Sequence, residues 1–328
     1  MRRYLLQRLA QLVAVLLVVS FLTFLLTNLL PGGPENAILG PNATPEAVAE
    51  LRAELRLDDP LPVRYVRWLG DVVQGDFGES YTQRMPISEL LADRLPRSLE
   101  LMVVAQFLAL AVAIPLGIAS AYRAGGWLDR WANMTAFGLL ALPNFILAVL
   151  LVFFLSLGGV VVFGRQVGVD FFPATGLVPW SVDAVAHVKS LFLPALALAA
   201  GQIAVYMRLL RTDMVATLQE DYIGTARAKG IPTRRILFRH ALKPSSFSLL
   251  TVAGINVGAL IGGAVIIESI FVFGGIGDLI VRSIYTRDYL TIQAGVLVVA
   301  AGFVIVNFLV DLLYSVLDPR IRHVRAAV

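Results

Sequence analysis

The chain contains no cysteine in its 328 residues and only three histidines, His187, His240 and His323. Without cysteine there can be no disulfide, no thiolate metal site and no cysteine nucleophile. The histidines are far apart in sequence and lie outside the long apolar stretches, so they predict neither a metal cluster nor a histidine-based triad. We therefore expect this chain to have no catalytic residue and no metal site.

Charge is scarce as well: 15% of the residues are charged and 58% are hydrophobic, against roughly 25% charged in an average soluble domain. A bilayer core about 30 Å thick is crossed by about 20 apolar residues in a helix. Six stretches without Asp, Glu, Lys or Arg reach 18 residues. One such stretch is compatible with a buried core helix, but six predict an all-α membrane protein with six transmembrane helices. They lie between Arg8 and Glu35, Glu100 and Arg123, Arg130 and Arg165, Lys189 and Arg208, Lys243 and Glu268, and Asp288 and Asp311.

The first stretch has the basic flank of a secretory signal peptide, supplied by Arg2, Arg3 and Arg8. Its apolar run from Leu9 to Leu30 is longer than the apolar region of a signal peptide. The run ends in Pro31-Gly32-Gly33, which is no small-residue cleavage site. We interpret it as a retained transmembrane helix.

The distribution of charge predicts the orientation in the membrane. Residues 1–8, 122–131, 208–247 and 318–328 hold 16 of the 27 Lys and Arg residues but only five of the 23 Asp and Glu residues. Positive loops face the cytoplasm, so both termini of this multi-pass membrane protein are predicted to be cytoplasmic. Because the basic residues are spread over several loops, they do not indicate nucleic-acid binding.

Four regions follow from this topology. Residues 1–30 form a cytoplasmic stub and the first helix, and residues 31–97 form a long extracellular loop. Residues 98–317 form the core with the second to sixth helices, and residues 318–328 form a cytoplasmic tail.

Within the long extracellular loop, two short helices are predicted, one ending at Leu55 and one from Arg64 to Val73, followed by a turn at Gly75–Gly78. Composition leaves open whether this loop is a solvated cap or a docking surface for an extracellular partner.

The cytoplasmic segment 212–247 has the pattern of a helix, a sharp turn and a second helix. Acidic Glu220 and Asp221 suit the start of a helix. Gly230 suits a left-handed C-terminal cap, and Pro232 prevents continuation. Thr233 is expected to cap the second helix, Arg234–Leu242, and Pro244 to end it. By itself this segment is also compatible with a basic hairpin resting on anionic lipid.

Several residues inside the spans are candidates for packing or for the substrate path. Gly254, Gly258 and Gly262 recur every four residues and predict a smooth helix face for close packing. Glu268 and Asn256 are candidates for the substrate path, because polar groups at membrane depth usually face a cavity or a partner. Gln202 and Tyr206 share this property, and nothing in the sequence ranks the four. Asp311 is expected to pair with a nearby arginine or a backbone group.

No Gly-x-x-x-x-Gly-Lys-Ser/Thr motif is present, so the chain cannot cradle ATP in the P-loop manner. If ATP drives any process here, another polypeptide must bind the nucleotide.

Nearly the whole chain resembles the permease subunits of bacterial dipeptide, oligopeptide and nickel ABC importers. The strongest element runs Glu220-Asp-Tyr-Ile-Gly-Thr-Ala-Arg-Ala-Lys-Gly-Ile231, followed by Arg239-His-Ala-Leu242, and it resembles the family's cytoplasmic coupling loop. Ala226 and Gly230 keep the family spacing, while Gly224 and Thr225 stand where related permeases have Glu and Ala. Weaker similar stretches include Leu57–Leu61, Leu193-Pro194 and Asp311–Tyr314.

The resemblance implies the fold of a type I ABC importer permease and a role as half of a translocation path for peptides. It implies that the following residues couple to an ATPase: Asp221, Tyr222, Ile223, Gly224, Thr225, Ala226, Arg227, Ala228, Lys229 and Gly230. Tyr222 and Ile223 would be anchors buried in the ATPase groove. The implied partners are a second homologous permease, one or two P-loop ATPase subunits that bind ATP and Mg, an extracellular substrate-binding protein, and lipid.

Three alternatives are weighed against this interpretation. An ion-coupled secondary transporter often has inverted repeats and broken helices, and no repeat between the halves is visible. A channel would need a filter-like motif, and an ATP-driven exporter would extend its helices far into the cytoplasm. The helix-Gly-Pro-helix segment 221–242 has no purpose in any of them. The substrate stays open among dipeptides, longer peptides, glutathione, nickel chelates and sugars, with peptide favoured.

Overall fold

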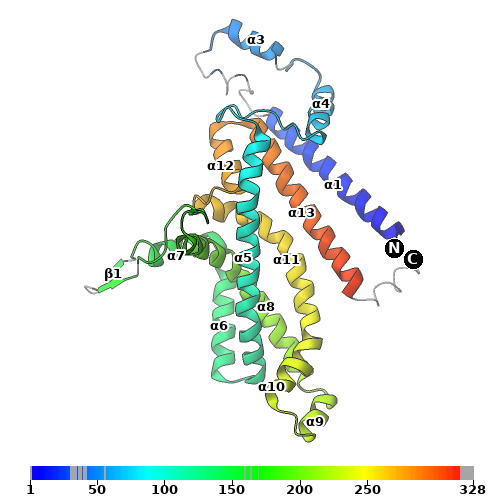
Figure 1. The fold of residues 1–328 in the computed structure, drawn as a ribbon, viewed down its shortest axis with the longest axis vertical. Helices are drawn as coiled ribbons and strands as arrows, with labels where there is room; N and C mark the ends of the chain where they lie inside the picture. Colours follow the sequence, from blue (N-terminus) through cyan, green and yellow to red (C-terminus); the bar gives the residue numbers. More distant parts are fainter. Residues whose placement is uncertain are drawn as a thin grey trace. The chain divides into compact units, whose positions relative to one another are not determined.

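The computed structural model describes residues 2–29, 35, 39, 43–54, 57–158, 160–162, 165–168 and 170–317. Helices dominate the fold (Figure 1). The predicted C-terminal tail, 318–328, lies outside the described residues. The elements are α1 (Arg2–Leu29), α3 (Pro45–Glu54), α4 (Leu61–Val73), α5 (Ile87–Tyr122), α6 (Trp127–Ala141), α7 (Asn144–Leu155), β1 (Val160–Val162), β2 (Arg165–Val167), α8 (Ala184–Thr217), α9 (Asp221–Ala228), α10 (Thr233–Arg235), the π-helix η1 (Ile236–Ala241), α11 (Leu242–Ile270), α12 (Ile276–Thr286) and α13 (Tyr289–Leu317).

Five helices in the described part of the chain are long and apolar enough to cross a membrane, and the pair α6 and α7 makes a sixth span if counted as one. The prediction of six spans is confirmed on that count, but the third is no straight helix. Its two halves meet at an angle of 107°. Pro143 causes the break, because the residue before a proline avoids the helical conformation, and Leu142 is extended with ψ 123°.

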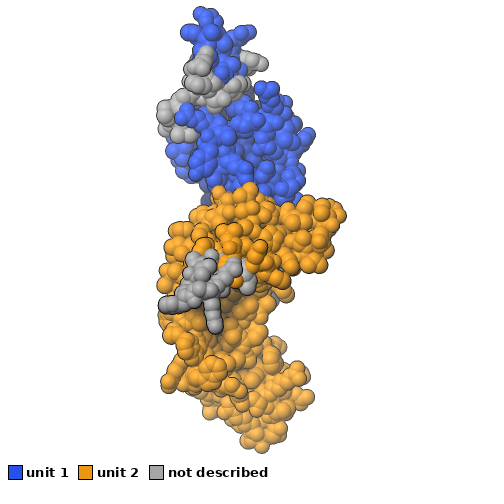
Figure 2. Space-filling model, turned by 90° about the vertical axis from the view of Figure 1, so that its left-hand side faces the viewer, with its two compact units in different colours: residues 1–99, 274–308 blue, residues 100–273, 309–328 orange. Residues whose placement is uncertain are grey.

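The chain divides into two compact units, shown in different colours in Figure 2. The first comprises residues 1–99 and 274–308, and the second comprises residues 100–273 and 309–328. Each unit therefore combines segments that are distant in sequence.

In the first unit, the helices predicted after α1 are present as α3 and α4. Helix α4 begins at Leu61, three residues before its predicted start, because Pro60 and Pro62 suit a helix start. An aromatic cluster packs α4 on α1: the Tyr65 ring lies 5.3 Å from that of Phe21 and 5.5 Å from that of Phe24. The Tyr65 hydroxyl also bonds to Ser20 Oγ at 2.8 Å.

The predicted extracellular loop is shorter than expected, because α5 already begins at Ile87 instead of after Arg97. The sequence analysis also missed α12. Both findings have one cause: the start of α5 and helix α12 share an apolar core that includes Ile87, Leu91 and Leu279. This burial lets the helix continue past charged residues that were assigned to a loop.

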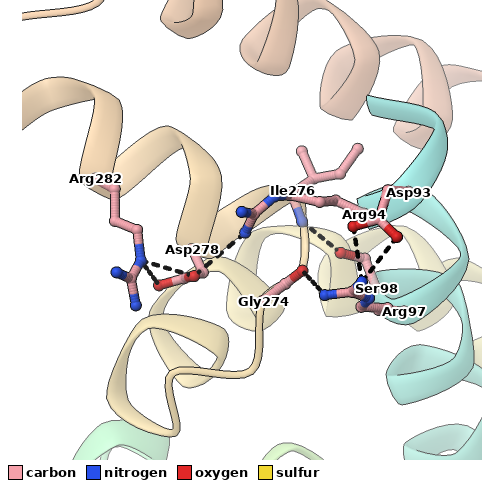
Figure 3. Close-up of polar contacts among 8 residues, drawn as sticks. All are labelled: Asp93, Arg94, Arg97, Ser98, Gly274, Ile276, Asp278 and Arg282. Carbon is pink, nitrogen blue, oxygen red and sulfur yellow. Dashed lines mark hydrogen bonds and ion pairs between the residues drawn. The ribbon is translucent and has the colours of Figure 1, made fainter. Parts of the chain in front are cut away.

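Polar contacts fix α12 against α5 in the same unit (Figure 3). Asp278 is buried and lies between Arg282, whose Nε is 2.9 Å away, and Arg94 at 3.5 Å. Arg97 pairs with Asp93 at 2.7 Å and donates to the Gly274 carbonyl at 3.3 Å. Because these partners come from both helices, the network fixes their register.

The second unit is built around α8, which contacts α6, α7 and α11. Its buried face is rich in alanine, including Ala195, Ala199 and Ala204, which permits close approach of neighbouring helices. One short element departs from the all-α expectation: β1 and β2 pair as antiparallel strands, with Val160 opposite Val167.

Candidate functional site

The segment between α8 and α11 folds as the predicted helical hairpin. Helix α8 ends at Thr217, and α9 begins after Glu220, whose extended backbone (φ −67°, ψ 145°) turns the chain. Asp221 lies in the first turn of α9, where the helix dipole favours a negative charge.

Gly230 ends α9 in the left-handed conformation, with φ +71°. Its N–H donates to the Arg227 carbonyl at 2.9 Å, and the Ile231 N–H donates to the Ala226 carbonyl at 3.2 Å. These bonds satisfy carbonyls that the helix end leaves free. The predicted left-handed cap at Gly230 is confirmed.

The hairpin has a small apolar core of its own, formed by Ile223, Ala226 and Ile236 with Leu218 and Ile231 packed against it. Ile223 is 0% exposed. It therefore stabilises the hairpin, and the prediction that it inserts into a partner is wrong. Helical periodicity alone could not decide whether this apolar side chain faces the chain or a partner.

Tyr222 differs from its neighbour, because 46% of its surface is exposed. It lies on the outer surface of the hairpin, and its predicted role as an anchor in an ATPase groove stays a prediction. Its hydroxyl donates a long hydrogen bond to the His240 carbonyl at 3.4 Å.

The second helix of the hairpin differs from the prediction. Pro232, not Thr233, occupies the capping position, and Pro244 does not end the helix. Instead the π-helix η1 leads into α11, with the Leu242 N–H bonded to the Leu237 carbonyl five residues back. Pro244 has no N–H to offer the His240 carbonyl, and the wider π turn accommodates this defect within a continuous helix.

Two hydroxyl groups tie the base of the hairpin together. Ser245 donates to the Ala241 carbonyl at 2.9 Å, so its oxygen accepts from Thr217 Oγ1 at 3.0 Å. The end of α8 and the start of α11 are thus linked by a partly buried side-chain bond at the base of the hairpin.

The outer surface of α9 is polar and exposed. It comprises Asp221, Tyr222, Gly224, Thr225, Arg227, Ala228, Lys229 and Gly230. Of the ten residues predicted to couple to an ATPase, only Ile223 and Ala226 are buried. The geometry is that of a capped helix with one face buried in the hairpin and the other exposed.

A partly buried ion pair that the sequence analysis did not identify lies in the same unit. Asp129, which is 3% exposed, accepts from Arg211 Nε and Nη2, each at 2.7 Å. It also accepts from the Gly125 N–H and from Asn133 Nδ2, both at 2.8 Å. The pair joins the start of α6 to α8, two turns before α8 ends. Because 82 residues separate the partners, sequence pattern could not pair them.

The polar residues within the spans form two contacts. Asn256 Nδ2 donates to Gln202 Oε1 at 2.8 Å, and the Tyr206 hydroxyl donates to Gln106 Oε1 at 3.2 Å. Gln106 was not among the candidates. These contacts give a polar strip in the second unit that includes Asn256, one of the two predicted path residues.

Glu268, the other predicted path residue, is only 1% exposed. The side chain of Asp311 lies outside the described residues.

The glycine face of α11 is divided between two surroundings. Gly258 is buried, whereas Gly262 is exposed and a Cβ added there would meet no atom within 4 Å. Gly263, by contrast, lies where a Cβ would be 3.1 Å from Leu198 of α8. The chain's own packing therefore explains the glycine at 263 but leaves Gly262 facing open space.

Comparison with known proteins gives matches along the whole chain. The family described as binding-protein-dependent transport system inner membrane component matches residues 113–323, and the N-terminal part of such membrane components matches residues 1–102. The chain is 38% identical over 323 residues to a Brucella abortus protein that carries the name of a peptide transport system permease, covering 98% of this chain and 100% of the relative.

Two further relatives are similar over the same extent. A dipeptide transport system permease protein of Alkalihalophilus pseudofirmus is 37% identical, covering 98% of this chain and 100% of the relative. A glutathione transport system permease protein of Salmonella paratyphi A is 36% identical with the same coverage.

Proposed function

The chain belongs to the family of inner-membrane components of binding-protein-dependent transport systems, and we propose that it forms half of the translocation path of an ATP-driven importer of di- or oligopeptides. The observation that carries this proposal is the rigid hairpin around α9, whose exposed face has no function within the chain. An ion-coupled carrier has no need for such an element.

We infer that α9 seats in a groove on a separate P-loop ATPase. The chain has no phosphate-binding loop, so ATP and Mg belong to that partner. Closure of the ATPase has to reach the membrane helices through a stiff element. The capped helix α9, held by the Thr217–Ser245 bond, is such an element.

Charge around the hairpin supports contact with an acidic surface. Arg227, Lys229, Arg234 and Arg235 are all exposed. At the rim of an interface such charges steer association more than they add affinity. From the same distribution we infer that the hairpin and both termini lie in the cytoplasm, which would leave the opposite side for the substrate-binding protein.

The exposed glycine of α11 supports a second permease subunit as the neighbour within the membrane. A Gly262→Leu substitution adds bulk where this chain has open space, so the chain itself should fold and insert normally. We expect the assembled complex to be lost, measured by co-purification of the second permease. Gly138→Leu, a change at another glycine with no atom within 4 Å of an added Cβ, is the control. Normal assembly of Gly262→Leu would place this face against lipid.

The substrate class is inferred from the relatives, whose names refer to peptides, dipeptides and glutathione. All three are short chains of amino acids with charged ends. The polar strip of Gln106, Gln202, Tyr206 and Asn256 offers uncharged hydrogen-bonding groups of the kind that a peptide needs in a translocation path.

The proposal is tested by affinity purification from gently solubilised membranes. We expect a second six-span permease and a P-loop ATPase to co-purify in near-equal amounts, and the ATPase to be lost when residues 221–230 are replaced by a flexible linker. Purification of the protein alone, or as a homo-oligomer, would contradict the importer assignment and favour an ion-coupled carrier.

A further inference from the structure

A pocket of about 230 Å³ lies within the first compact unit, among α1, α4, the turn at residues 76–81 and the start of α13. Drug-sized ligands occupy pockets of about 300–1,000 Å³, so this one suits a smaller molecule. Its lining is mixed: five residues are aromatic, and four are charged, namely Arg64, Arg67, Asp71 and Asp76. The aromatic ones are Phe24, Trp68, Phe77, Tyr81 and Tyr289. The charge distribution of the loops assigns this end of α1 and α13 to the outside of the cell.

Arg64 is a half-buried cation in the pocket wall whose hydrogen bonds go to neutral oxygens. Its Nη2 donates to Asn28 Oδ1 at 2.6 Å, and its Nη1 donates to the Leu57 carbonyl at 3.3 Å. Across the described residues, no carboxylate lies within ion-pair distance of this guanidinium. Neighbouring Arg67, by contrast, pairs with Asp59 at 2.9 Å. Burial lowers the pKa of Arg64, but an arginine stays charged in proteins, so it can still pair with an anion.

Gln293 also lines this pocket, and its side-chain oxygen is buried. The Thr27 hydroxyl donates to the carbonyls of Thr23 and Phe24, each at 3.0 Å. Thr27 can therefore only accept from Gln293 Nε2, which fixes the orientation of the amide. Gln293 is 3% exposed, and its Oε1 has no hydrogen-bond partner among the described residues. A buried acceptor of this kind normally has a donor, which a ligand N–H would supply.

Another part of the pocket wall is formed by the turn at residues 76–81. Gly78 has φ +79°, and its N–H donates to Asp76 Oδ1 at 2.8 Å. Ser80 donates to buried Asp288 at 2.5 Å, which fixes the turn to the start of α13. Burial raises the pKa of Tyr81 to about 12, so its hydroxyl is neutral at physiological pH. The pocket is thus formed before any ligand binds.

We propose that this pocket binds the free carboxyl end of a short peptide. Arg64 pairs with the carboxylate, Gln293 Oε1 accepts an N–H of the ligand, and the aromatic walls cover an apolar side chain. A bidentate arginine–carboxylate pair is among the strongest polar contacts available. The choice of a peptide rests on the proposed function, whereas the carboxylate and the N–H follow from the pocket itself.

The test measures equilibrium binding of radiolabelled Ala-Phe and of its C-terminal amide to the purified complex in nanodiscs, without binding protein or ATP. We expect the amide to bind the wild type roughly tenfold or more weakly, as loss of a charged hydrogen bond predicts. Arg64→Gln should bind both probes equally and weakly. Arg84→Gln, which removes the same charge from an exposed residue outside the pocket, should keep the wild-type preference.

A second variant tests the amide oxygen independently. Gln293→Leu removes the acceptor but leaves Arg64 in place, so both probes should weaken while the preference for the free carboxylate remains. Absence of binding to the wild type, or an unchanged preference in Arg64→Gln, would overturn the inference.

Uptake into proteoliposomes with binding protein and ATP separates this inference from the proposed function. If peptide uptake proceeds but Arg64→Gln keeps the carboxylate preference, the pocket assignment fails and the importer stands. If no peptide is taken up but the preference is present and depends on Arg64, the carboxylate site stands and the proposed function fails.

Discussion

Replacing Gly230 with proline should abolish ATP-driven uptake while leaving the protein in the membrane. Proline fixes φ at about −65°, whereas Gly230 has φ +71°. The substitution also removes the N–H that donates to the Arg227 carbonyl. We expect a cost of roughly 3 kcal/mol or more, which is enough to unfold the small core around Ile223. The measurements are peptide uptake and ATPase co-purification.

Gly230→Asn is the matched control, because asparagine tolerates the left-handed conformation better than other residues with a side chain. It should retain most of the transport rate and bind the ATPase. Normal transport by the proline variant would show that the capped turn is unnecessary for coupling.

The second large effect is expected from Arg211→Ala. This change leaves Asp129 buried with its charge uncompensated, although Gly125 and Asn133 still donate to it. Breaking one side of a fully buried ion pair costs about 3–5 kcal/mol, and the cost here should lie at or below the low end because the Arg211 side chain is 26% exposed. We expect a lower thermal unfolding temperature of the purified protein and loss of transport, because α8 leads directly into the hairpin.

The double variant Arg211→Ala with Asp129→Ala separates a charge penalty from lost packing. Removing both partners takes away the uncompensated charge, so it should recover a large part of the stability lost in the single variant. A double variant no more stable than Arg211→Ala would contradict the assignment of the penalty to buried charge.

The membrane spans and the turn of the hairpin could be predicted from sequence because their causes are local. A helix that crosses lipid excludes charge along its whole length, so charge-free runs mark it directly. Gly230 and Pro232 likewise determine the end of α9 through their own backbone preferences. The hairpin of α9 was therefore predicted with its turn, but the sequence did not show which side of α9 is buried.

The remaining features depend on contacts between distant segments. Pro143 is visible in the sequence, but a proline inside a long apolar run is also compatible with a kinked span, so the 107° bend was not predicted. The side of α9 that Ile223 occupies is decided by Ile236 across the hairpin. Helix α12 was missed because its packing partners lie on α5, far away in sequence.

The pocket around Arg64 was missed for the same reason. The sequence analysis treated residues 31–97 as a cap or a docking surface and gave no role to any single arginine. Arg67 pairs with Asp59, whereas Arg64 has no carboxylate partner within the described part of the chain. This difference becomes visible only when α1, α4 and α13 are placed together.

Site-directed crosslinking from α9 tests the central claim most directly, and the chain is suited to it because it contains no cysteine. Thr225→Cys places one thiol on the exposed face of α9, and Thr286→Cys places one at the exposed C-terminal end of α12 as the control. With a thiol-to-amine crosslinker, Thr225→Cys should capture a P-loop ATPase and Thr286→Cys should not. Failure of Thr225→Cys to capture an ATPase in transport-competent membranes would contradict the coupling role of this hairpin.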